Sequence, residues 1–123
     1  YSMDLPEEYN KALDAVFGNH GNTGAGMSNI PPFIKEGQAL WDATMADSVL
    51  RGWKRYRKRP IMQINGSMHS DYGYGLVDRL RKANRKLKVS VVSIKRDKGY
   101  PQIETGKYDT MGDYVILTGD ERK

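Results

Sequence analysis

The sequence Asn65-Gly66-Ser67-Met68-His69-Ser70-Asp71-Tyr72-Gly73-Tyr74-Gly75 decides the fold of this chain. It follows a short apolar run, Ile61-Met62-Gln63-Ile64, and precedes an amphipathic run that begins at Leu76. A strand that leads through a glycine-rich turn into a helix is typical of open α/β sheets, which bind ligands at the carboxyl ends of their strands. We therefore expect the functional site here, with the histidine facing an apolar hollow at the carboxyl edge of a parallel sheet.

Three apolar segments predict β-strands, and the first two flank a predicted helix. The strands are expected over 61–65, 89–94 and 114–117, and the helices over 4–17, 33–57 and 76–87. The segment from 61 to 94 is thus a strand–helix–strand unit, which we expect to be parallel and right-handed. The sequence predicts an α/β fold in which a small, mostly parallel sheet of about three strands is flanked by helices.

Three strands give a thin core, because a parallel sheet needs cover on both faces. We expect residues 1–123 to form a single domain or the C-terminal portion of a larger three-layer α/β fold. An N-terminal half of the same protein, or a homo-oligomer, would then complete the core. Residues 19–32 form a glycine-rich loop that is longer than most connections in compact domains, which predicts a functional or mobile segment.

The helix expected over 33–57 is apolar on two sides. On the side nearly opposite its core stripe lie Ile34, Trp41 and Met45. A helix with one buried face does not need Trp41 and Met45. We expect them to be covered by another layer of the fold, a partner subunit or a flat apolar ligand. The core stripe consists of Ala39, Ala43, Ala46, Leu50 and Trp53.

Composition places the chain among globular proteins, with 38% hydrophobic and 28% charged residues and no cysteine. The net charge of +5 comes largely from two basic clusters, at 54–59 and 79–88. Both clusters lie near the ends of predicted helices, where cations favour the helix dipole, so we expect no nucleic-acid partner. No apolar stretch approaches the ~18–20 residues of a transmembrane helix, so we expect no membrane span in this chain.

The glycine turn carries the side chains that haem binding requires. Haem needs an axial histidine or tyrosine, a flat apolar slot, and cations or N–H groups for its propionates. The candidates for the axial ligand are His69, Tyr74 and Tyr72. Trp41 and Met45 could supply the apolar slot, and Arg79 or the start of the following helix could bind the propionates.

A divalent metal is the alternative cofactor, again with His69 as the ligand. A hydrolytic metal site needs three or more ligands, and the chain adds only His20, Asp71 and Asp42 to that histidine. A serine hydrolase is not expected, since the chain has no Gly-x-Ser-x-Gly motif. We therefore name no catalytic residues and expect a role other than catalysis.

Three parts of the chain carry recognisable motifs. They are Gln38-Ala39-Leu40-Trp41-Asp42-Ala43-Thr44-Met45-Ala46, then Gly66-Ser67-Met68-His69 followed by Tyr74-Gly75-Leu76 with Arg79-Leu80, and finally Gly112-Asp113-Tyr114-Val115. Together they resemble the ChaN-like haem-binding proteins, the iron-regulated lipoproteins of bacterial envelopes that belong to the haem-binding uptake, Tiki/EreA-like superfamily. The motifs of that family are a Trp-Asp-x-x-Met-Ala helix, a Gly-x-x-His turn, a Tyr-Gly-Ile-Pro-x-Arg-Leu helix start and a closing strand. Ser67-Met68 replaces the usual Asn-Gly, and Val77 stands where the family has proline.

The resemblance, which covers roughly residues 33–118, implies a haem-binding protein of iron acquisition whose haem is commonly held between subunits. It implies the bacterial cell envelope as the location, either periplasmic or as an outer-membrane lipoprotein. Because the family's opening Gly-Glu-x-His strand is absent, the chain corresponds to the C-terminal half, and a lipid anchor would precede it in the full-length protein. The wider superfamily includes metal-dependent proteases whose Gly-x-x-His turn carries metal, so a fragment of a metal-dependent hydrolase is the alternative.

Overall fold

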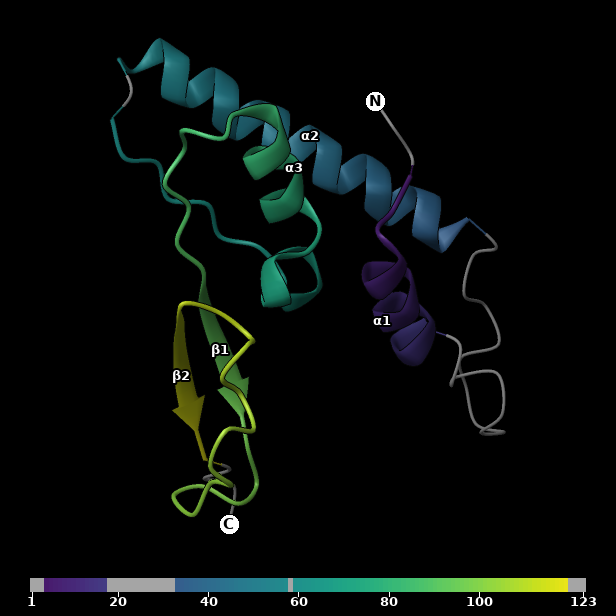
Figure 1. Ribbon diagram of the computed structural model, residues 1–123, viewed down its shortest axis with the longest axis vertical. Helices are drawn as coiled ribbons and strands as arrows, with labels where there is room; N and C mark the ends of the chain where they lie inside the picture. Colours follow the sequence, from purple (N-terminus) through teal and green to yellow (C-terminus); the bar gives the residue numbers. More distant parts are fainter. Residues whose placement is uncertain (1–3, 18–32, 58, 120–123) are drawn as a thin grey trace. The chain divides into compact units, whose positions relative to one another are not determined.

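The computed structural model describes residues 4–17, 33–57 and 59–119. The predicted glycine-rich loop at 19–32 and His20 within it lie outside these residues. The described elements (Figure 1) are the helices α1 (Glu7–Phe17), α2 (Ile34–Arg55) and α3 (Leu76–Ala83), the 3₁₀-helices η2 (Ser67–His69) and η3 (Asp71–Gly73), and the strands β1 (Val92–Arg96) and β2 (Tyr114–Thr118).

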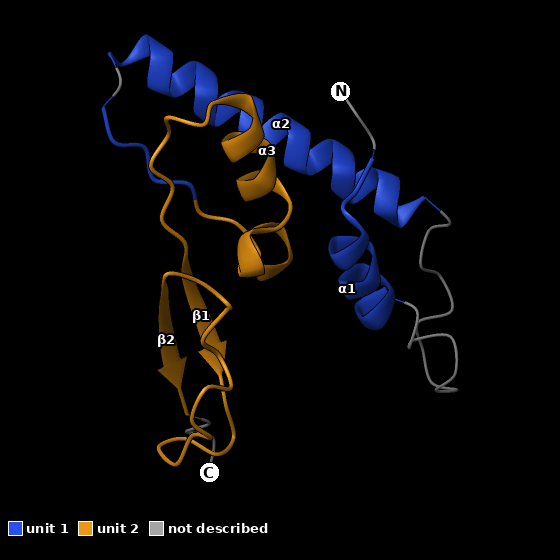
Figure 2. Ribbon diagram, viewed as in Figure 1, with its two compact units in different colours: residues 1–63 blue, residues 64–123 orange. Residues whose placement is uncertain are grey.

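The chain forms two compact units, Tyr1–Gln63 and Ile64–Lys123 (Figure 2). The first unit contains α1 and α2, and the second contains the glycine turn, α3 and both strands. Helices and a small parallel sheet confirm the predicted α/β class.

In the first unit, α1 is held to α2 by a buried polar contact. Tyr9 and Leu13 form the buried face of α1, one helical turn apart. The Tyr9 hydroxyl donates to Oδ2 of Asp42 at 2.9 Å, and Asp42 is fully buried. A buried carboxylate requires such a donor, because desolvation of an unpaired charge is costly. This contact fixes the α1–α2 pair.

The long helix α2 was correctly predicted, and its charges follow the helix dipole. Glu36 lies in its first turn, whereas Lys54 and Arg55 lie in its last turn, where cations interact favourably with the unpaired carbonyls. The second basic cluster likewise places Arg81 and Lys82 in the last turn of α3. The buried residues of α2 are Gln38, Ala39, Asp42, Ala43 and Ala46.

The sheet of the second unit has two parallel strands, not about three. Val92 pairs with Tyr114 and Arg96 with Thr118, in continuous register. The prediction of a strand at Ile61–Asn65 is wrong for the described part of the chain, since this segment joins no ladder there. A strand requires a partner for its backbone groups, and apolar residues cannot create one. The expected strand–helix–strand unit is therefore not formed.

A long connection without regular secondary structure, residues 97–113, joins the two strands; we call it the crossover. Parallel strands need such a connection, because the chain must return to the same end of the sheet. Side chains of β2 that point to one face, Val115 and Leu117, line a hollow together with crossover residues 103–109.

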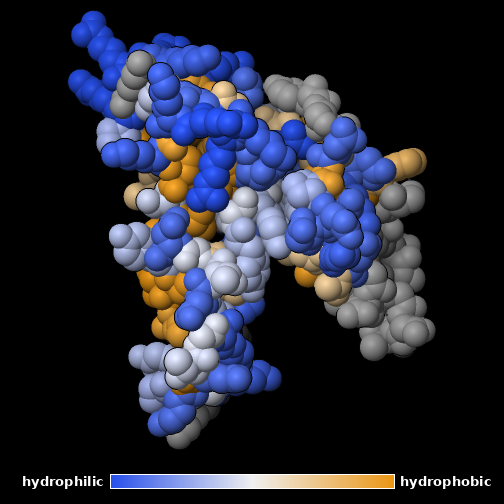
Figure 3. All heavy atoms as spheres, in the orientation of Figure 1, coloured by the Kyte–Doolittle hydropathy of each residue, from blue (hydrophilic) through white to orange (hydrophobic). Residues whose placement is uncertain are grey.

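The other face of the sheet carries apolar side chains that are each more than half exposed. Figure 3 shows hydrophobic side chains gathered over this part of the molecule. They alternate along the strands, as expected from a two-residue period, and consist of Val92 and Ile94 on β1 and Tyr114 and Ile116 on β2. Among the helices in the described ranges, none combines the length and apolar character that crossing a bilayer demands.

Candidate functional site

The glycine turn is built from two consecutive 3₁₀-helices that change direction at Tyr72. The amide of His69 donates to the carbonyl of Gly66 at 3.0 Å, which closes the first of them. Tyr72 lies in the second, with φ 60° and ψ 13°, in the left-handed region. A non-glycine residue is uncommon there, so its surroundings must stabilise this conformation.

Two hydrogen bonds tie the turn to β1 and to the end of the crossover. The Ser93 hydroxyl donates to Oδ1 of Asp71 at 2.7 Å, and the Tyr72 amide donates to the carbonyl of Met111 at 2.8 Å. Within the turn, the Asn65 side-chain amide donates to Oγ of Ser70 at 3.0 Å. The turn is thus anchored through Asp71 and Tyr72, the two residues where it changes direction.

The anchored turn brings its two tyrosines together. The rings of Tyr72 and Tyr74 are 5.9 Å apart between centroids, with an interplanar angle of 39°. Tyr72 is about half exposed, whereas Tyr74 and His69 are half-buried. An imidazole and two phenols therefore lie within six residues of one turn, and all three are recognised ligands of haem iron.

Helix α3 begins directly after the turn, and its first turn carries Arg79. Gly75 is the N-cap residue, with φ 56° and ψ −122°, a conformation that glycine adopts without steric cost. Its carbonyl accepts from the Arg79 amide at 3.3 Å, and the Arg79 side chain is half-buried. Four of the predicted site residues, His69, Tyr72, Tyr74 and Arg79, thus belong to one continuous segment.

The remaining predicted site residues, Trp41 and Met45, lie on α2 in the first unit. Trp41 is 57% exposed, and Met45, one turn later, is half-buried. The Gln63 side-chain amide donates to Sδ of Met45 at 3.7 Å. On this side of the helix the Trp41 indole is thus largely accessible within the described structure, whereas the Met45 thioether is partly covered.

The expectation that the turn lies at the carboxyl edge of the sheet is wrong for the sheet observed. Ser93 is the second residue of β1, and Met111 precedes the start of β2 by three positions. Both anchors are therefore at the amino ends of the strands. The reason is that Ile61–Asn65, whose carboxyl end would have carried the turn, is not a strand of this sheet.

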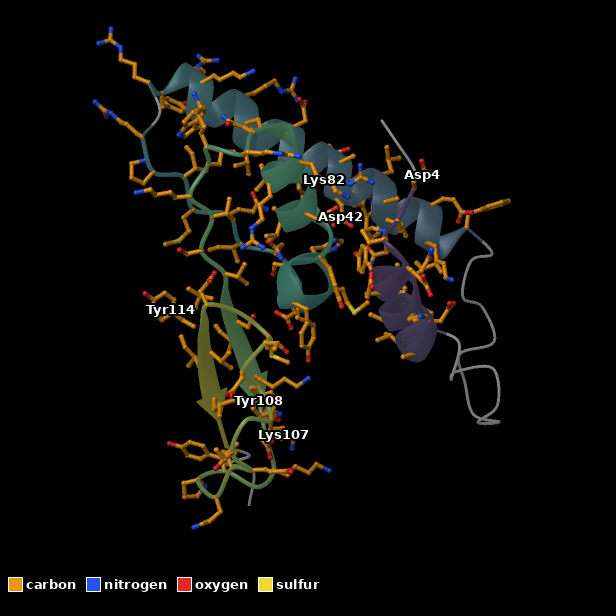
Figure 4. The ribbon with its side chains drawn as sticks, viewed as in Figure 1. Asp4, Asp42, Lys82, Lys107, Tyr108 and Tyr114 are labelled. Atoms are coloured by element: carbon orange, nitrogen blue, oxygen red, sulfur yellow. The ribbon has the colours of Figure 1, made fainter. Side chains whose placement is uncertain are left out.

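The carboxyl ends of the strands carry a different polar cluster, formed by Asp97, Lys107 and Tyr108. Figure 4 labels Lys107 and Tyr108. Oδ2 of Asp97 accepts from Nζ of Lys107 at 2.8 Å and from the Tyr108 hydroxyl, while Oδ1 accepts from the Gly99 amide at 2.7 Å. The Lys107 hydrogen bond, with those of Tyr108 and Gly99, holds the pKa of the Asp97 carboxyl far below its ordinary value. The same carboxylate raises the pKa of Lys107 and of Tyr108.

Residues of the crossover and of β2 line an open hollow of about 430 Å³. Its lining includes Val115 and Leu117 together with Lys107 and Tyr108. Since these two polar side chains bind Asp97, we interpret the cluster as the attachment of the crossover to the end of β1. None of the predicted site residues lines this hollow.

The described residues contain no group of three or more histidine, cysteine, aspartate or glutamate side chains that could hold a metal ion. Asp71, one of the oxygen donors considered from the sequence, accepts instead from Ser93. His20, another, belongs to the part of the chain that is not described.

Sequence reasoning missed Ser93, Met111 and Gly112. Gly112 leaves room for Ser93, because a Cβ at position 112 would lie 2.9 Å from its hydroxyl oxygen. A usable signal for Ser93 was present, since this serine interrupts the apolar run Val89-Ser90-Val91-Val92-Ser93-Ile94 and is buried within it. A buried hydroxyl in a strand needs a partner, and the nearby turn supplies one. The contributions of the Met111 carbonyl and of Gly112 are backbone effects, which no side-chain pattern reveals.

Comparison with known proteins identifies the class to which this fold and turn belong. Residues 1–80 match the family model described as haem-binding uptake, Tiki superfamily, ChaN. The chain belongs to this family, which confirms the resemblance seen in its motifs. The matched portion begins earlier than the motifs suggested and ends within α3, so β1, the crossover and β2 lie beyond it. No curated protein and no solved structure matches the chain.

Proposed function

We propose that this protein binds haem and that the glycine turn supplies the iron ligand. The observation that carries the proposal is the grouping of an imidazole and two phenols on one anchored turn, with the phenol rings 5.9 Å apart. Bound iron would provide an electrophilic centre for one of these donors. The family to which the chain belongs is named for haem binding, which gives the donor set its most economical interpretation.

The residues present fit the chemical demands of haem. His69, Tyr72 and Tyr74 offer nitrogen or oxygen donors of the kind that ligate haem iron. Arg79, half-buried in the first turn of α3, offers a guanidinium for a propionate, a pairing that can form two hydrogen bonds. In the first unit, the exposed Trp41 indole and the Met45 thioether offer an apolar surface of the type on which a porphyrin packs.

Titration of the 123-residue chain with hemin tests the proposal. We expect a Soret band that saturates at a defined stoichiometry and weakens in the His69→Ala, Tyr72→Phe and Tyr74→Phe variants. Trp41→Ala should lower the affinity without changing the ligand-sensitive visible bands. Tyr100→Phe is a matched control, because Tyr100 is also exposed but lies on the crossover. Absence of a saturable band in the unmodified chain would refute the proposal.

We further propose that the full-length protein acts in iron or haem acquisition at the bacterial cell envelope. The uptake function in the family description supports this role. A periplasmic protein or a lipoprotein held by an N-terminal lipid anchor are the two forms consistent with it. Fractionation of cells that express the full-length protein, under iron-replete and iron-depleted conditions, would test location and iron regulation together.

We also propose that haem is shared between two copies of the protein. The exposed apolar side chains of the sheet and of α2 are compatible with association, since contiguous apolar surface often marks an interaction site. Sedimentation of the chain with and without hemin tests this. A haem-dependent shift from monomer to dimer is expected, and an unchanged monomer with bound haem would contradict it.

A further inference from the structure

The tyrosine pair depends on one residue in an unfavourable conformation. Tyr72 has φ 60°, while Gly73 and Gly75, with φ 73° and φ 56°, occupy the same half of conformational space more easily. Left-handed backbone costs a residue with a Cβ more than it costs glycine. An isolated turn would therefore favour a Tyr72 with negative φ, which would direct the phenol elsewhere.

Strand β1 and the end of the crossover supply the interactions that hold Tyr72 in this conformation. Ser93 donates from β1 to the Asp71 carboxylate at 2.7 Å, immediately before Tyr72 in the chain. The Met111 carbonyl accepts from the Tyr72 amide itself at 2.8 Å. Both Ser93 and Met111 are only 3% exposed. Water therefore competes poorly for these groups, and the hydrogen bonds count for more than they would at the surface.

The two anchors are also linked to each other. Oγ of Ser93 lies 3.2 Å from the Met111 carbonyl oxygen as well as 2.7 Å from Oδ1 of Asp71. Its single hydroxyl proton serves the closer acceptor, and rotation can deliver it to the other. Gly112 allows this approach, because a Cβ at that position would lie 2.9 Å from the serine oxygen.

We propose that Ser93 is a positioning residue, which together with the Met111 carbonyl fixes Tyr72 beside Tyr74 in the geometry needed to bind haem iron. This inference rests on the proposed haem function. It assigns a role to residues of β1 and of the crossover, which lie beyond the portion matched by the family model. The turn motif of the family would thus depend on the Ser93 hydroxyl, which lies 22 positions after Asp71 in the sequence.

The first test measures the anchor without haem. In Ser93→Ala, hydrogen exchange of the Tyr72 amide, followed by NMR, should be faster by roughly 5–10-fold, as expected when one buried hydrogen bond no longer supports the closed state. Ser90→Ala is the matched control, since Ser90 lies on the same segment but is exposed, and should leave the rate unchanged. Equal exchange rates of the Tyr72 amide in Ser93→Ala and in the unmodified chain would show that Ser93 does not anchor Tyr72.

The second test measures haem. Ser93→Ala should bind hemin roughly 5–10-fold more weakly and shift the visible bands that report the axial ligand, a signature that uniform loss of stability would not produce. Asp71→Asn keeps an oxygen acceptor and should stay near the unmodified chain, whereas Asp71→Ala should behave as Ser93→Ala does. The double variant Ser93→Ala/Asp71→Ala should be no worse than either single variant, because both remove one shared interaction.

The two tests separate the two claims. If the unmodified chain binds no haem while Ser93→Ala accelerates exchange at Tyr72, the proposed function fails and the anchor stands as a structural device only, which overturns the positioning role. If the unmodified chain binds haem and Ser93→Ala shows the same affinity and bands, the positioning role is wrong although the function holds. Should Ser93→Ala fail to fold, the Asp71→Asn and Asp71→Ala pair decides by the same criteria.

Discussion

An aspartate accepts hydrogen bonds at each end of the β1–β2 pair, and we call these two sets of contacts the closures. The two closures differ in the groups that donate to the aspartate. At the amino ends, Asp71 accepts from a neutral hydroxyl, and a strained tyrosine is held beside it. At the carboxyl ends, Asp97 accepts from a lysine, a tyrosine and a backbone amide. Asp71 anchors a turn that carries aromatic side chains. Asp97 instead binds Lys107, Tyr108 and the Gly99 amide.

This difference indicates where chemistry can occur. At the carboxyl ends, Lys107 and Tyr108 are engaged in attaching the crossover, so their polarity stabilises structure. At the amino ends, hydrogen bonds at the Asp71 carboxylate and at the Tyr72 amide hold the turn that carries the imidazole and the phenols. The proposed haem site would thus lie at the end of the strands opposite to the carboxyl edge, where open sheets usually bind their ligands.

The largest expected effect comes from adding a side-chain atom at Gly112, next to Ser93. Gly112→Ala would place a Cβ 2.9 Å from Oγ of Ser93 and 3.0 Å from the Val91 carbonyl oxygen. Overpacking of this kind should lower the free energy of unfolding by about 2 kcal/mol. Urea denaturation followed by circular dichroism gives the value.

Gly37→Ala is the matched control, because no atom lies within 4 Å of a Cβ at that position of α2. It should raise the free energy of unfolding by about 0.5–1 kcal/mol, the usual gain from replacing glycine in a helix. Two glycine-to-alanine changes with effects of the same sign and size would contradict the close packing at Gly112.

The next effect tests the turn at the amino ends. Gly75→Ala forces a Cβ onto a residue with φ 56° and ψ −122°, which should cost about 1–2 kcal/mol of stability. Thermal unfolding measures the loss, and Tyr74 fluorescence or NMR should show that the change is centred on the turn. A stability equal to that of the unmodified chain would mean that α3 can begin without this conformation.

A pH experiment distinguishes the two closures. Because the folded-state pKa of Asp97 lies below its ordinary value of 3.8, the stabilisation from this carboxylate is complete above that value and is lost as the pH falls toward the folded-state pKa. Asp97→Asn should be less stable at neutral pH and should lose part of the acid dependence. Urea midpoints at about pH 7 and about pH 2.5 test this.

The control for that experiment is a charge elsewhere in the same unit. Asp109→Asn removes an exposed carboxylate of the crossover and should leave the acid dependence intact. If Asp97→Asn and the unmodified chain respond identically to acid, the charged cluster does not attach the crossover as described.

The smallest expected effect is on the apolar face that neither closure covers. Ile116→Thr replaces a half-exposed side chain on β2 with another β-branched residue, so stability should change by less than about 0.5 kcal/mol. Solubility should increase if this face drives association, as light scattering would show. A loss comparable to that of Gly112→Ala would mean that the face is packed in solution.

Sequence patterns predicted much of this structure because helices depend mainly on local signals. The alanine stripe and terminal charges of α2, and the turn before Leu76, define helices that the structure contains. The strand at Ile61–Asn65 was predicted wrongly because a strand also requires a partner, which an apolar pattern does not provide. Because of this error, the turn was predicted at the carboxyl ends of the strands, whereas it lies at their amino ends.

The sequence allowed us to predict which side chains the candidate site contains, but not the contacts that hold them in place. His69, Tyr72 and Tyr74 share one turn in the sequence, so their proximity followed from spacing. The ring pairing of Tyr72 and Tyr74 depends on Ser93 and on a carbonyl at Met111, contacts between residues about 20–40 positions apart. Long-range hydrogen bonds of this kind are set by the fold, and the only local sign of them is the serine that interrupts the apolar run at Ser93.

Hemin titration of variants at the two ends of the strands tests the central claim most directly. The variants are His69→Ala and Tyr72→Phe/Tyr74→Phe at the amino ends, and Lys107→Ala and Tyr108→Phe at the carboxyl ends. The account predicts that only the amino-end variants weaken hemin binding, by about tenfold or more, the usual scale for disturbing a metal site. Equal weakening by both sets, or weakening by the carboxyl-end set alone, would contradict it.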